Sequence, residues 1–97
     1  MQDALGVIET LGLATAIEAA DAAVKAANVQ LGDYLIAGGG KASIIFRGDV
    51  AAVKASVEAG VASASKIGQV IAQTVIPRPS QKLNTVFKEI QPKTKKE

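Results

Sequence analysis

Two long stretches of the chain repeat their apolar side chains at the spacing of one helical face. The first stretch runs from residue 13 to 27, with apolar positions at Leu13, Ala16, Ile17, Ala20, Ala23, Val24 and Ala27. The second has the same spacing at Val50, Val53, Val57, Gly60, Val61 and Ala64. Intervals of three and four residues place side chains on one stripe of an α-helix. The pattern therefore predicts two helices, each with one face packed against a core.

The ends of both helices carry recognisable signals. Asn28 follows the first helix and is expected to end it, because asparagine tolerates the left-handed conformation. Asp49 precedes the second helix and is a good N-cap, because its carboxylate can accept a hydrogen bond from the first turn. Gly68 lies just past the second helix and is typical of a helix C-terminus.

Four further runs have patterns typical of strands: a short apolar run, an alternating run, a β-branched and aromatic run, and a final apolar run. These runs cover residues 4–9, 29–37, 42–47 and 69–76. The segment Pro-Arg-Pro at 77–79 ends the last strand, because proline cannot donate to a sheet ladder. Residues 81–90 then have the apolar spacing of a short C-terminal helix.

The predicted order of elements is β-α-β-β-α-β, in two halves of similar length. This is the order of the α+β, ferredoxin-like fold, in which two helices cover one face of a four-stranded antiparallel sheet. The second strand has apolar side chains on both faces, Leu31 and Leu35 on one and Tyr34 and Ile36 on the other. A helix layer covers only one face, so we expect a partner to cover part of the remainder.

Composition narrows the function. The chain has 97 residues, no cysteine and no histidine, so it is expected to be one domain without disulfides. The same absences argue against most zinc, haem and histidine-based acid–base chemistry. The first ten residues lack the features of a secretory signal, and no apolar stretch approaches the roughly 20 residues of a membrane span. We therefore expect a cytoplasmic protein without membrane contact.

The positive charge is concentrated at the C-terminus. Residues 80–97 hold five lysines and two glutamates, or +3, whereas residues 1–79 hold six basic and seven acidic side chains, or −1. A nucleic-acid-binding surface would need a basic face with interleaved aromatics, which this chain lacks. We expect no nucleic-acid partner, and residues 81–97 are interpreted as a short helix followed by a basic, partly disordered tail. A nucleic-acid binder that uses only this tail is a minor alternative.

The segment Gly38-Gly39-Gly40-Lys41 has some features of a phosphate-binding loop. The motif G-x-x-x-x-G-K-[ST] would need a glycine at Leu35 and a hydroxyl at Ala42. Phosphate loops also lead from a strand into a helix, whereas this segment joins two predicted strands. The glycines are therefore expected to act sterically, either by letting backbones crowd together or by keeping an opening clear.

Catalytic groups are not gathered in any recognisable pattern. The carboxylates are scattered, and the serines have no histidine to activate them. The tripeptide Arg-Gly-Asp at 47–49 is interpreted as a strand end, a turn and a helix cap. We expect a protein that is not an enzyme, with no catalytic residues, no bound metal and no cofactor.

The ordered set of motifs resembles bacterial microcompartment shell proteins of the single-domain, hexamer-forming type. The motifs are ALGVIET, then GL..AIEAADA.VKAANV, a glycine hairpin, RGDVAAVKASVEAG and VIPRP. This family includes proteins of propanediol- and ethanolamine-utilisation compartments and of carboxysomes. The resemblance implies a shell domain over residues 1–80 and does not constrain residues 81–97.

The resemblance implies a structural function. Family members form flat homohexamers that tile into a polyhedral shell, and a pore on the six-fold axis passes metabolites. The loop between the second and third strands lines that pore, which here means Gly38, Gly39, Gly40 and Lys41. Relatives often have serine at the position of Gly39, so a ring of this chain lacks six hydroxyls. Six Lys41 side chains near the axis are expected to favour small anionic or polar metabolites. The alternative is that Lys41 points along the strand and away from the lumen, which leaves only backbone N–H groups with the same preference.

The resemblance also implies an edge at which hexamers meet. The edge residues are Lys25, Asn28 and Arg78, and the expected partners are neighbouring hexamers, other shell proteins and encapsulated enzymes. From the residues alone, Lys25 is a surface lysine paired with Asp21. The alternative function is a ring-forming, ferredoxin-like regulatory module that binds a ligand. Its long responsive loop is missing here, because the hairpin has only about four residues.

Overall fold

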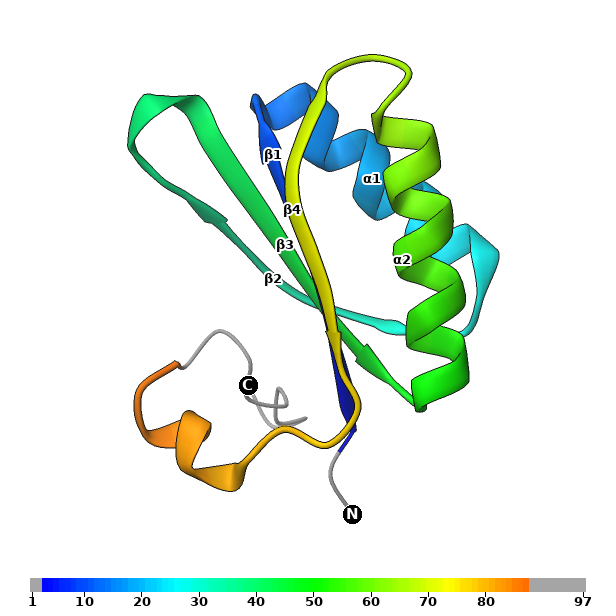
Figure 1. The fold of residues 1–97 in the computed structure, drawn as a ribbon, viewed down its shortest axis with the longest axis vertical. Helices are drawn as coiled ribbons and strands as arrows, with labels where there is room; N and C mark the ends of the chain where they lie inside the picture. The colour runs from blue at the N-terminus through cyan, green and yellow to red at the C-terminus, as the bar shows by residue number, and fades with distance from the viewer. Residues whose placement is uncertain (1–2, 88–97) are drawn as a thin grey trace, which may run out of the picture.

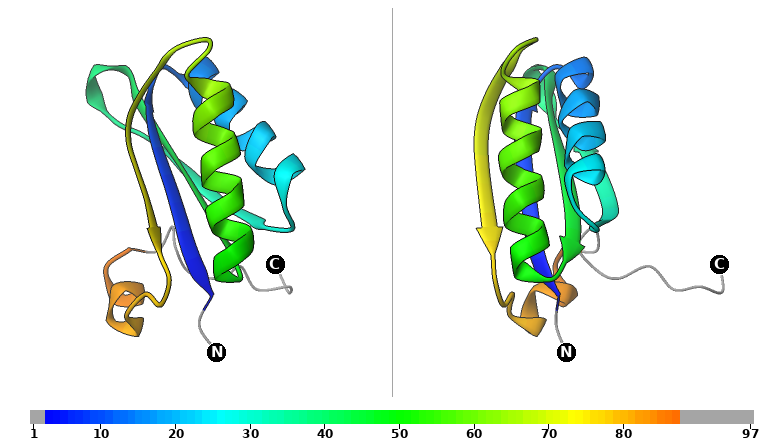
Figure 2. Two further views of the ribbon diagram at one scale, coloured as in Figure 1. Left: turned by 45° about the vertical axis from the view of Figure 1, so that its right-hand side comes forward. Right: turned by 90° about the vertical axis from the view of Figure 1, so that its right-hand side faces the viewer.

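Two α-helices cover one face of a four-stranded sheet in the computed structural model, which describes residues 3–87 (Figures 1 and 2). The elements are β1 (Ala4–Leu11), α1 (Leu13–Ala26), β2 (Gln30–Ile36), η1 (Gly38–Gly40), β3 (Lys41–Gly48), α2 (Val50–Ala64), β4 (Gln69–Ile76) and η2 (Gln81–Thr85). Both η elements are 3-10 turns. The predicted order β-α-β-β-α-β is confirmed.

The sheet has the order β2-β3-β1-β4, and every neighbouring pair is antiparallel. The central strands pair Val7 with Ile45 and Leu11 with Lys41. Two irregularities interrupt the ladders, one in β1 after Glu9 and one in β2 after Leu31. This arrangement confirms the ferredoxin-like fold class, and it leaves β2 and β4 as the two edges of the sheet.

The core lies between the sheet and the two helices. Phe46, Ile8 and Val53 are its largest fully buried apolar side chains. The helices approach each other closely, because a Cβ atom at Gly60 of α2 would lie 2.9 Å from the carbonyl oxygen of Ala19 in α1. Only small side chains fit at such a distance, since cores are packed as densely as organic crystals.

The stripe of α1 that is buried differs from the predicted stripe. Thr15, Ala16, Ala19 and Ala23 are buried, whereas the larger side chains Leu13, Ile17 and Val24 are exposed. The prediction was partly wrong, because spacing alone does not distinguish alanine from larger aliphatic side chains. The close approach of α2 and the sheet selects the alanines for the core and turns the larger side chains outward.

The helix ends confirm one signal and correct two others. Asp49 caps α2, since the Ala52 N–H donates to its Oδ1 atom at 3.2 Å. Helix α1 ends at Ala26, the next residue is extended, and no described residue other than glycine has a positive φ, so Asn28 is not a left-handed cap. Gly68 is not left-handed either, and its Cβ would lie only 2.0 Å from Thr15 Oγ1. Close approach to Thr15 therefore explains this glycine.

The predicted C-terminal helix is only a short 3-10 turn. The turn covers Gln81–Thr85 and is capped by Ser80, whose Oγ accepts a hydrogen bond from the Lys82 N–H at 3.1 Å. The following apolar side chains, Val86 and Phe87, are exposed, so they supply no packing that would extend the turn into an α-helix. The rest of the predicted helix and the basic tail lie outside the described residues. Between residues 3 and 87, no helix has the length and apolar character needed to cross a membrane.

Candidate functional site

The glycine loop η1 connects β2 to β3 at one end of the sheet (Figure 1). Gly39 and Gly40 have φ angles of +76° and +81°, which side chains other than glycine rarely adopt. At Gly38 and Gly39, no atom would lie within 4 Å of an added Cβ. Of the two steric explanations, crowding of backbones does not apply at the tip of the loop, because the space around Gly38 and Gly39 is open. The backbone conformation of Gly39 and Gly40 is a further reason for glycine.

Lys41 is the first residue of β3 and lies at the base of the loop. Its carbonyl oxygen accepts a hydrogen bond from the Ala37 N–H at 2.8 Å, which closes the hairpin. Ala42 and Ile44 belong to the core beneath the helices, and strand side chains alternate between faces. Lys41 therefore belongs to the opposite face of the sheet, where it is exposed beside its β1 partner Leu11.

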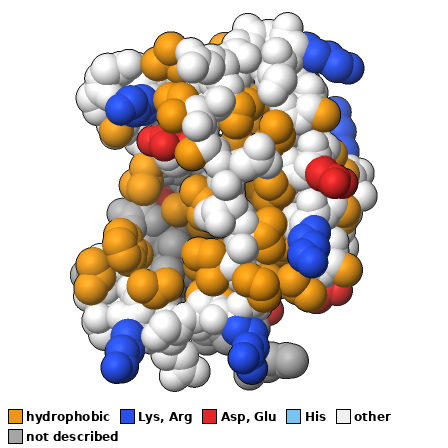
Figure 3. All heavy atoms as spheres, viewed as in Figure 1, with side chains coloured by type: hydrophobic (Ala, Val, Ile, Leu, Met, Phe, Trp, Pro, Cys, Tyr) orange, Lys and Arg blue, Asp and Glu red, His pale blue; other side chains and the backbone are white. Residues whose placement is uncertain are grey.

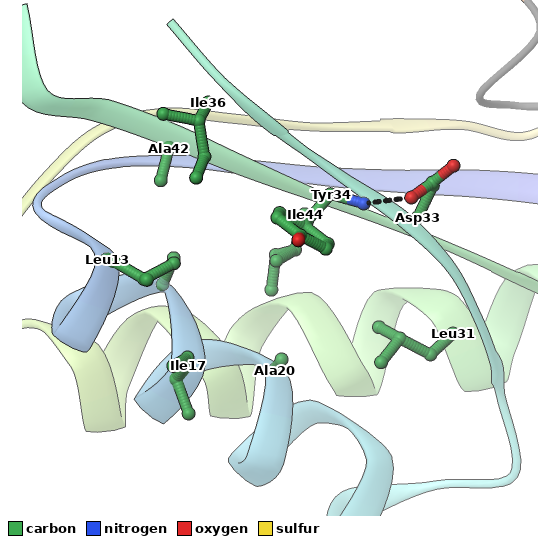
Figure 4. A pocket seen from close by; sticks show the side chains of 10 residues that line it. Leu13, Ile17, Ala20, Leu31, Asp33, Tyr34, Ile36, Ala42 and Ile44 are labelled. Atoms are coloured by element: carbon green, nitrogen blue, oxygen red, sulfur yellow. Dashed lines mark hydrogen bonds between the residues drawn. The ribbon is translucent and has the colours of Figure 1, made fainter.

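An apolar groove lies between α1 and the edge strand β2 (Figure 4). It has a volume of about 420 Å³, and its large side chains are Leu13, Ile17, Leu31, Tyr34 and Ile36. Exposure is high for side chains of this size, at 59% for Ile17, 59% for Tyr34 and 64% for Ile36. In Figure 4 these side chains extend from the helix and the strand into the space between them.

Sequence reasoning had expected uncovered apolar side chains on the helix-free face of the second strand, with Leu31 and Tyr34 on opposite faces, and it had assigned Leu13 and Ile17 to the core. The structure corrects this, because Leu31, Tyr34 and Ile36 pair with core residues of β3 and all line the groove on the helix side. The irregularity after Leu31 shifts the register and brings Leu31 to the same face as Tyr34. The available signal was side-chain size, because the α1 stripe has alanines on one side and larger aliphatic side chains on the other. Hydrophobic side chains are also prominent on the face seen in Figure 3, where lysines and arginines lie nearer the outline.

Lys25 lies near the C-terminal end of α1 and forms an ion pair with Asp21. The Lys25 Nζ atom is 2.8 Å from Asp21 Oδ2, and the two side chains are 74% and 52% exposed. The hydrogen bond to Asp21 and the charge of its carboxylate raise the pKa of Lys25 above its ordinary value. Lys25 therefore carries its charge throughout the neutral pH range, at the surface of the molecule.

Asn28 and Arg78 both lie around the end of β3. The Asn28 carbonyl oxygen would be 3.4 Å from a Cβ atom at Gly48, the last residue of β3. Arg78 and Gly48 both line a hollow of about 520 Å³. The structure thus brings Asn28 and Arg78 to one end of β3, with Lys25 one turn earlier on α1. The glycine loop lies at the other end of this eight-residue strand, roughly 25 Å away.

Ser63 and Lys66 have the Ser-x-x-Lys spacing of some nucleophilic serines, a pattern that the sequence reasoning had missed. The Ser63 hydroxyl instead donates to Glu18 Oε2 at 2.5 Å, which joins α2 to α1. Between residues 3 and 87, no group of three acidic, histidine or cysteine side chains is placed to hold a metal ion.

The chain is similar to proteins of known role. The BMC domain family matches residues 4–79. PduA of Citrobacter freundii, a bacterial microcompartment shell protein, is 58% identical over 78 residues, which are 80% of this chain and 84% of PduA. EutM of Escherichia coli strain K12, also a bacterial microcompartment shell protein, is 52% identical over 85 residues, which are 88% of each chain.

A solved structure supports the same assignment. The crystal structure of a microcompartments protein from Desulfitobacterium hafniense DCB matches 88% of this chain with a TM-score of 0.79 and 42% identity. This chain spans about half of that longer protein, or 48% of its length. The fold, the family match and the shell-protein relatives agree, and the chain belongs to the BMC domain family of bacterial microcompartment shell proteins.

Proposed function

We propose that this chain forms homohexamers that tile into the shell of a bacterial microcompartment in the cytoplasm and conduct small metabolites through a central pore. The observation that carries the proposal is the apolar groove between α1 and β2. Large aliphatic and aromatic side chains exposed together on a small domain are unfavourable in water, and they mark a surface that a partner covers. A second copy of the chain is the partner proposed here.

A ring needs two complementary surfaces on each copy, because neighbouring subunits meet through different patches. The groove lies at the β2 edge of the sheet. Exposed Ile67 and Ile71 lie at the opposite edge, before and within β4. These positions are suited to a head-to-tail contact that closes on itself. The number of six copies is taken from the family.

The glycine loop is proposed to line the pore. Gly38 and Gly39 extend into open space and present only backbone atoms, which suits a narrow passage for small molecules. Lys41 lies at the base of the loop on the helix-free face, so its charge is placed at one mouth of the pore. Six such charges would raise the local concentration of anionic metabolites at that mouth.

Contacts between hexamers are proposed at the far end of the molecule, through Lys25, Asn28 and Arg78. Neighbouring hexamers, other shell proteins and encapsulated enzymes are the expected partners. The edge contact repeats in the plane, so individually weak contacts can still hold a shell together through their number.

Native mass spectrometry tests the ring directly. We expect six copies for the unaltered chain and single copies for Ile17→Asp, because a charge in the groove cannot be desolvated without a large penalty. Ala55→Asp, on an exposed position of α2, is the matched control and should stay hexameric. Three copies for the unaltered chain would favour a trimeric regulatory module, and a hexamer of Ile17→Asp would exclude the groove as the interface.

A further inference from the structure

The turn between β1 and α1 makes direct contact with the glycine loop. The Gly12 N–H donates to the carbonyl oxygen of Gly40 at 2.6 Å. Both residues have positive φ angles, +96° at Gly12 and +81° at Gly40. Two backbone conformations that favour glycine therefore meet at one hydrogen bond, which links two turns far apart in the sequence.

Thr10 supports this contact through its buried hydroxyl group. Its side chain is fully buried, and its hydroxyl lies 3.1 Å from two acceptors, the carbonyl oxygens of Gly12 and Ala42. Gly12 belongs to the turn, and Ala42 follows the base of the loop in β3. One buried hydroxyl thus ties together the two chain segments between which Gly40 is held. Valine has the same shape as threonine, so packing alone does not require the hydroxyl.

The two halves of the loop differ in their support. Gly40 is held by Gly12, and the Leu11 Cδ1 atom would lie 3.7 Å from a Cβ atom at Gly40. Gly38 and Gly39 have no atom within 4 Å of their corresponding positions. Gly40 is therefore held by a contact from outside the hairpin, whereas the space beside Gly38 and Gly39 is open.

We propose that Thr10 and Gly12 are positioning residues of the pore, which fix Gly40 and thereby set the aperture and the ion preference. The inference rests on the proposed pore function. Neither residue needs to touch a permeating molecule, because both act through the backbone of the loop. Of the three loop glycines, Gly38 and Gly39 are then the ones whose backbone can yield when a molecule passes.

The contacts through which Thr10 and Gly12 hold Gly40 are called the brace below. Single-channel currents of hexamers in planar lipid bilayers test whether the brace sets the pore properties. The unaltered chain and Thr10→Ser are expected to share one conductance level and one reversal potential in a salt gradient. Thr10→Val should at least double the spread of conductance levels and move the reversal potential towards zero, with six copies retained by mass. Ser56→Ala removes another fully buried hydroxyl, on α2, and should leave the currents unchanged.

A merely structural role for Thr10 predicts a different result. Thr10→Val would then lower the melting temperature but leave conductance and reversal potential as in the unaltered hexamer, and this result would overturn the proposal. If Thr10→Val does not fold, Leu11→Ala replaces it, because Leu11 is 43% exposed and its loss removes the side support of Gly40. Unchanged currents in Leu11→Ala would then count against the brace.

Amide hydrogen exchange tests the contact between Gly12 and Gly40 independently of whether the hexamer conducts. We expect the Gly12 amide to be protected in the unaltered chain and to exchange about tenfold faster in Thr10→Val or Leu11→Ala. An unprotected Gly12 amide would overturn the brace whether or not the hexamer conducts. Protection together with hexamers that pass no current would retain the contact but reject the pore function.

Discussion

At the level of single residues, the three loop glycines are not equivalent. Gly38 has an ordinary backbone conformation and open space around it. Gly39 has the same open space but a left-handed conformation, and Gly40 is left-handed and braced. The same side chain should therefore have different effects on stability at neighbouring positions, although it would narrow the proposed pore in each case.

Alanine substitutions at Gly38 and Gly39 test this difference. Gly38→Ala should raise the free energy of unfolding by about 0.4–1 kcal/mol, because it restricts the unfolded chain without strain in the folded one. Gly39→Ala should lower it by about 1–2 kcal/mol, because alanine is strained at positive φ. Urea unfolding at one fixed protein concentration measures both, and equal effects would contradict the loop geometry.

The charge of Lys41 is predicted to act on flux and not on the fold. Lys41→Ala should slow the entry of an anionic metabolite into assembled shells, because it removes the six positive charges proposed at one mouth of the pore. The effect should fade as salt rises, since the screening length falls to about 3 Å at 1 M ionic strength. Lys54→Ala on α2 is the control, and equal flux at low salt would contradict a role for the Lys41 charge.

At the level of elements, the sequence predicted what depends on local rules. Strands, the two main helices and the Asp49 cap follow from periodicity and capping, and the structure confirms them. The buried side of α1 does not follow from local rules, because it depends on how closely α2 approaches. Ala19 is buried and Ile17 exposed for this reason, although both are apolar and two residues apart.

Part of the candidate site could likewise be predicted from the sequence, and part could not. The glycine hairpin was predictable, because glycines between two strand patterns indicate a turn. The groove was not, because it forms only where the sheet order places β2 beside α1. The brace at Gly12 and Thr10 was also missed, since it joins residues that are about 30 positions apart in the chain.

The close contact between α1 and α2 predicts that a side chain added at Gly60 destabilises the protein. Gly60→Ala would place a Cβ atom 2.9 Å from the Ala19 carbonyl oxygen and 2.8 Å from Ile8 Cδ1. The backbone of α1 cannot yield without moving the whole helix, and overpacking of this kind costs about 1–3 kcal/mol. Alanine also gains about 1 kcal/mol of helix propensity, so we expect a net loss of up to about 2 kcal/mol.

Urea unfolding measures this loss against a matched substitution in the same helix. Ala62→Gly, at an exposed position of α2, should cost about 1 kcal/mol through propensity alone. If Gly60→Ala stabilised the protein by the amount that Ala62→Gly destabilises it, the close approach of the two helices would be absent in solution.

At the level of the whole molecule, the proposed functions occupy different places. The groove and the exposed isoleucines lie at opposite edges of the sheet, which suits a closed ring. The glycine loop and the Asn28–Arg78 region lie at opposite ends of β3, which suits a pore at the centre and contacts at the periphery. One small domain can therefore separate the contacts that make a hexamer from those that make a shell.

Substitution of Lys25 tests whether the contacts between hexamers are separate from those within a hexamer. Lys25→Ala should leave hexamers intact in native mass spectrometry but abolish extended sheets in electron micrographs, because the side chain is outside the groove and is proposed to lie at the hexamer edge. Lys54→Ala is the control for loss of an exposed lysine. Sheets of normal appearance from Lys25→Ala would show that the edge lies elsewhere.

The ion pair with Asp21 predicts how the tiling of hexamers depends on pH. Asp21 raises the pKa of Lys25 above 10.5, so the contribution of the pair is fully present below that pH and is lost only as pH rises through the raised value. Lys25 is therefore charged at both pH 6 and pH 9, and its titration cannot alter tiling between them. Asp21→Asn removes the pair but leaves the lysine, so sheets should persist. Their loss in Asp21→Asn would mean that the edge depends on the paired geometry of Lys25 and not on the lysine alone.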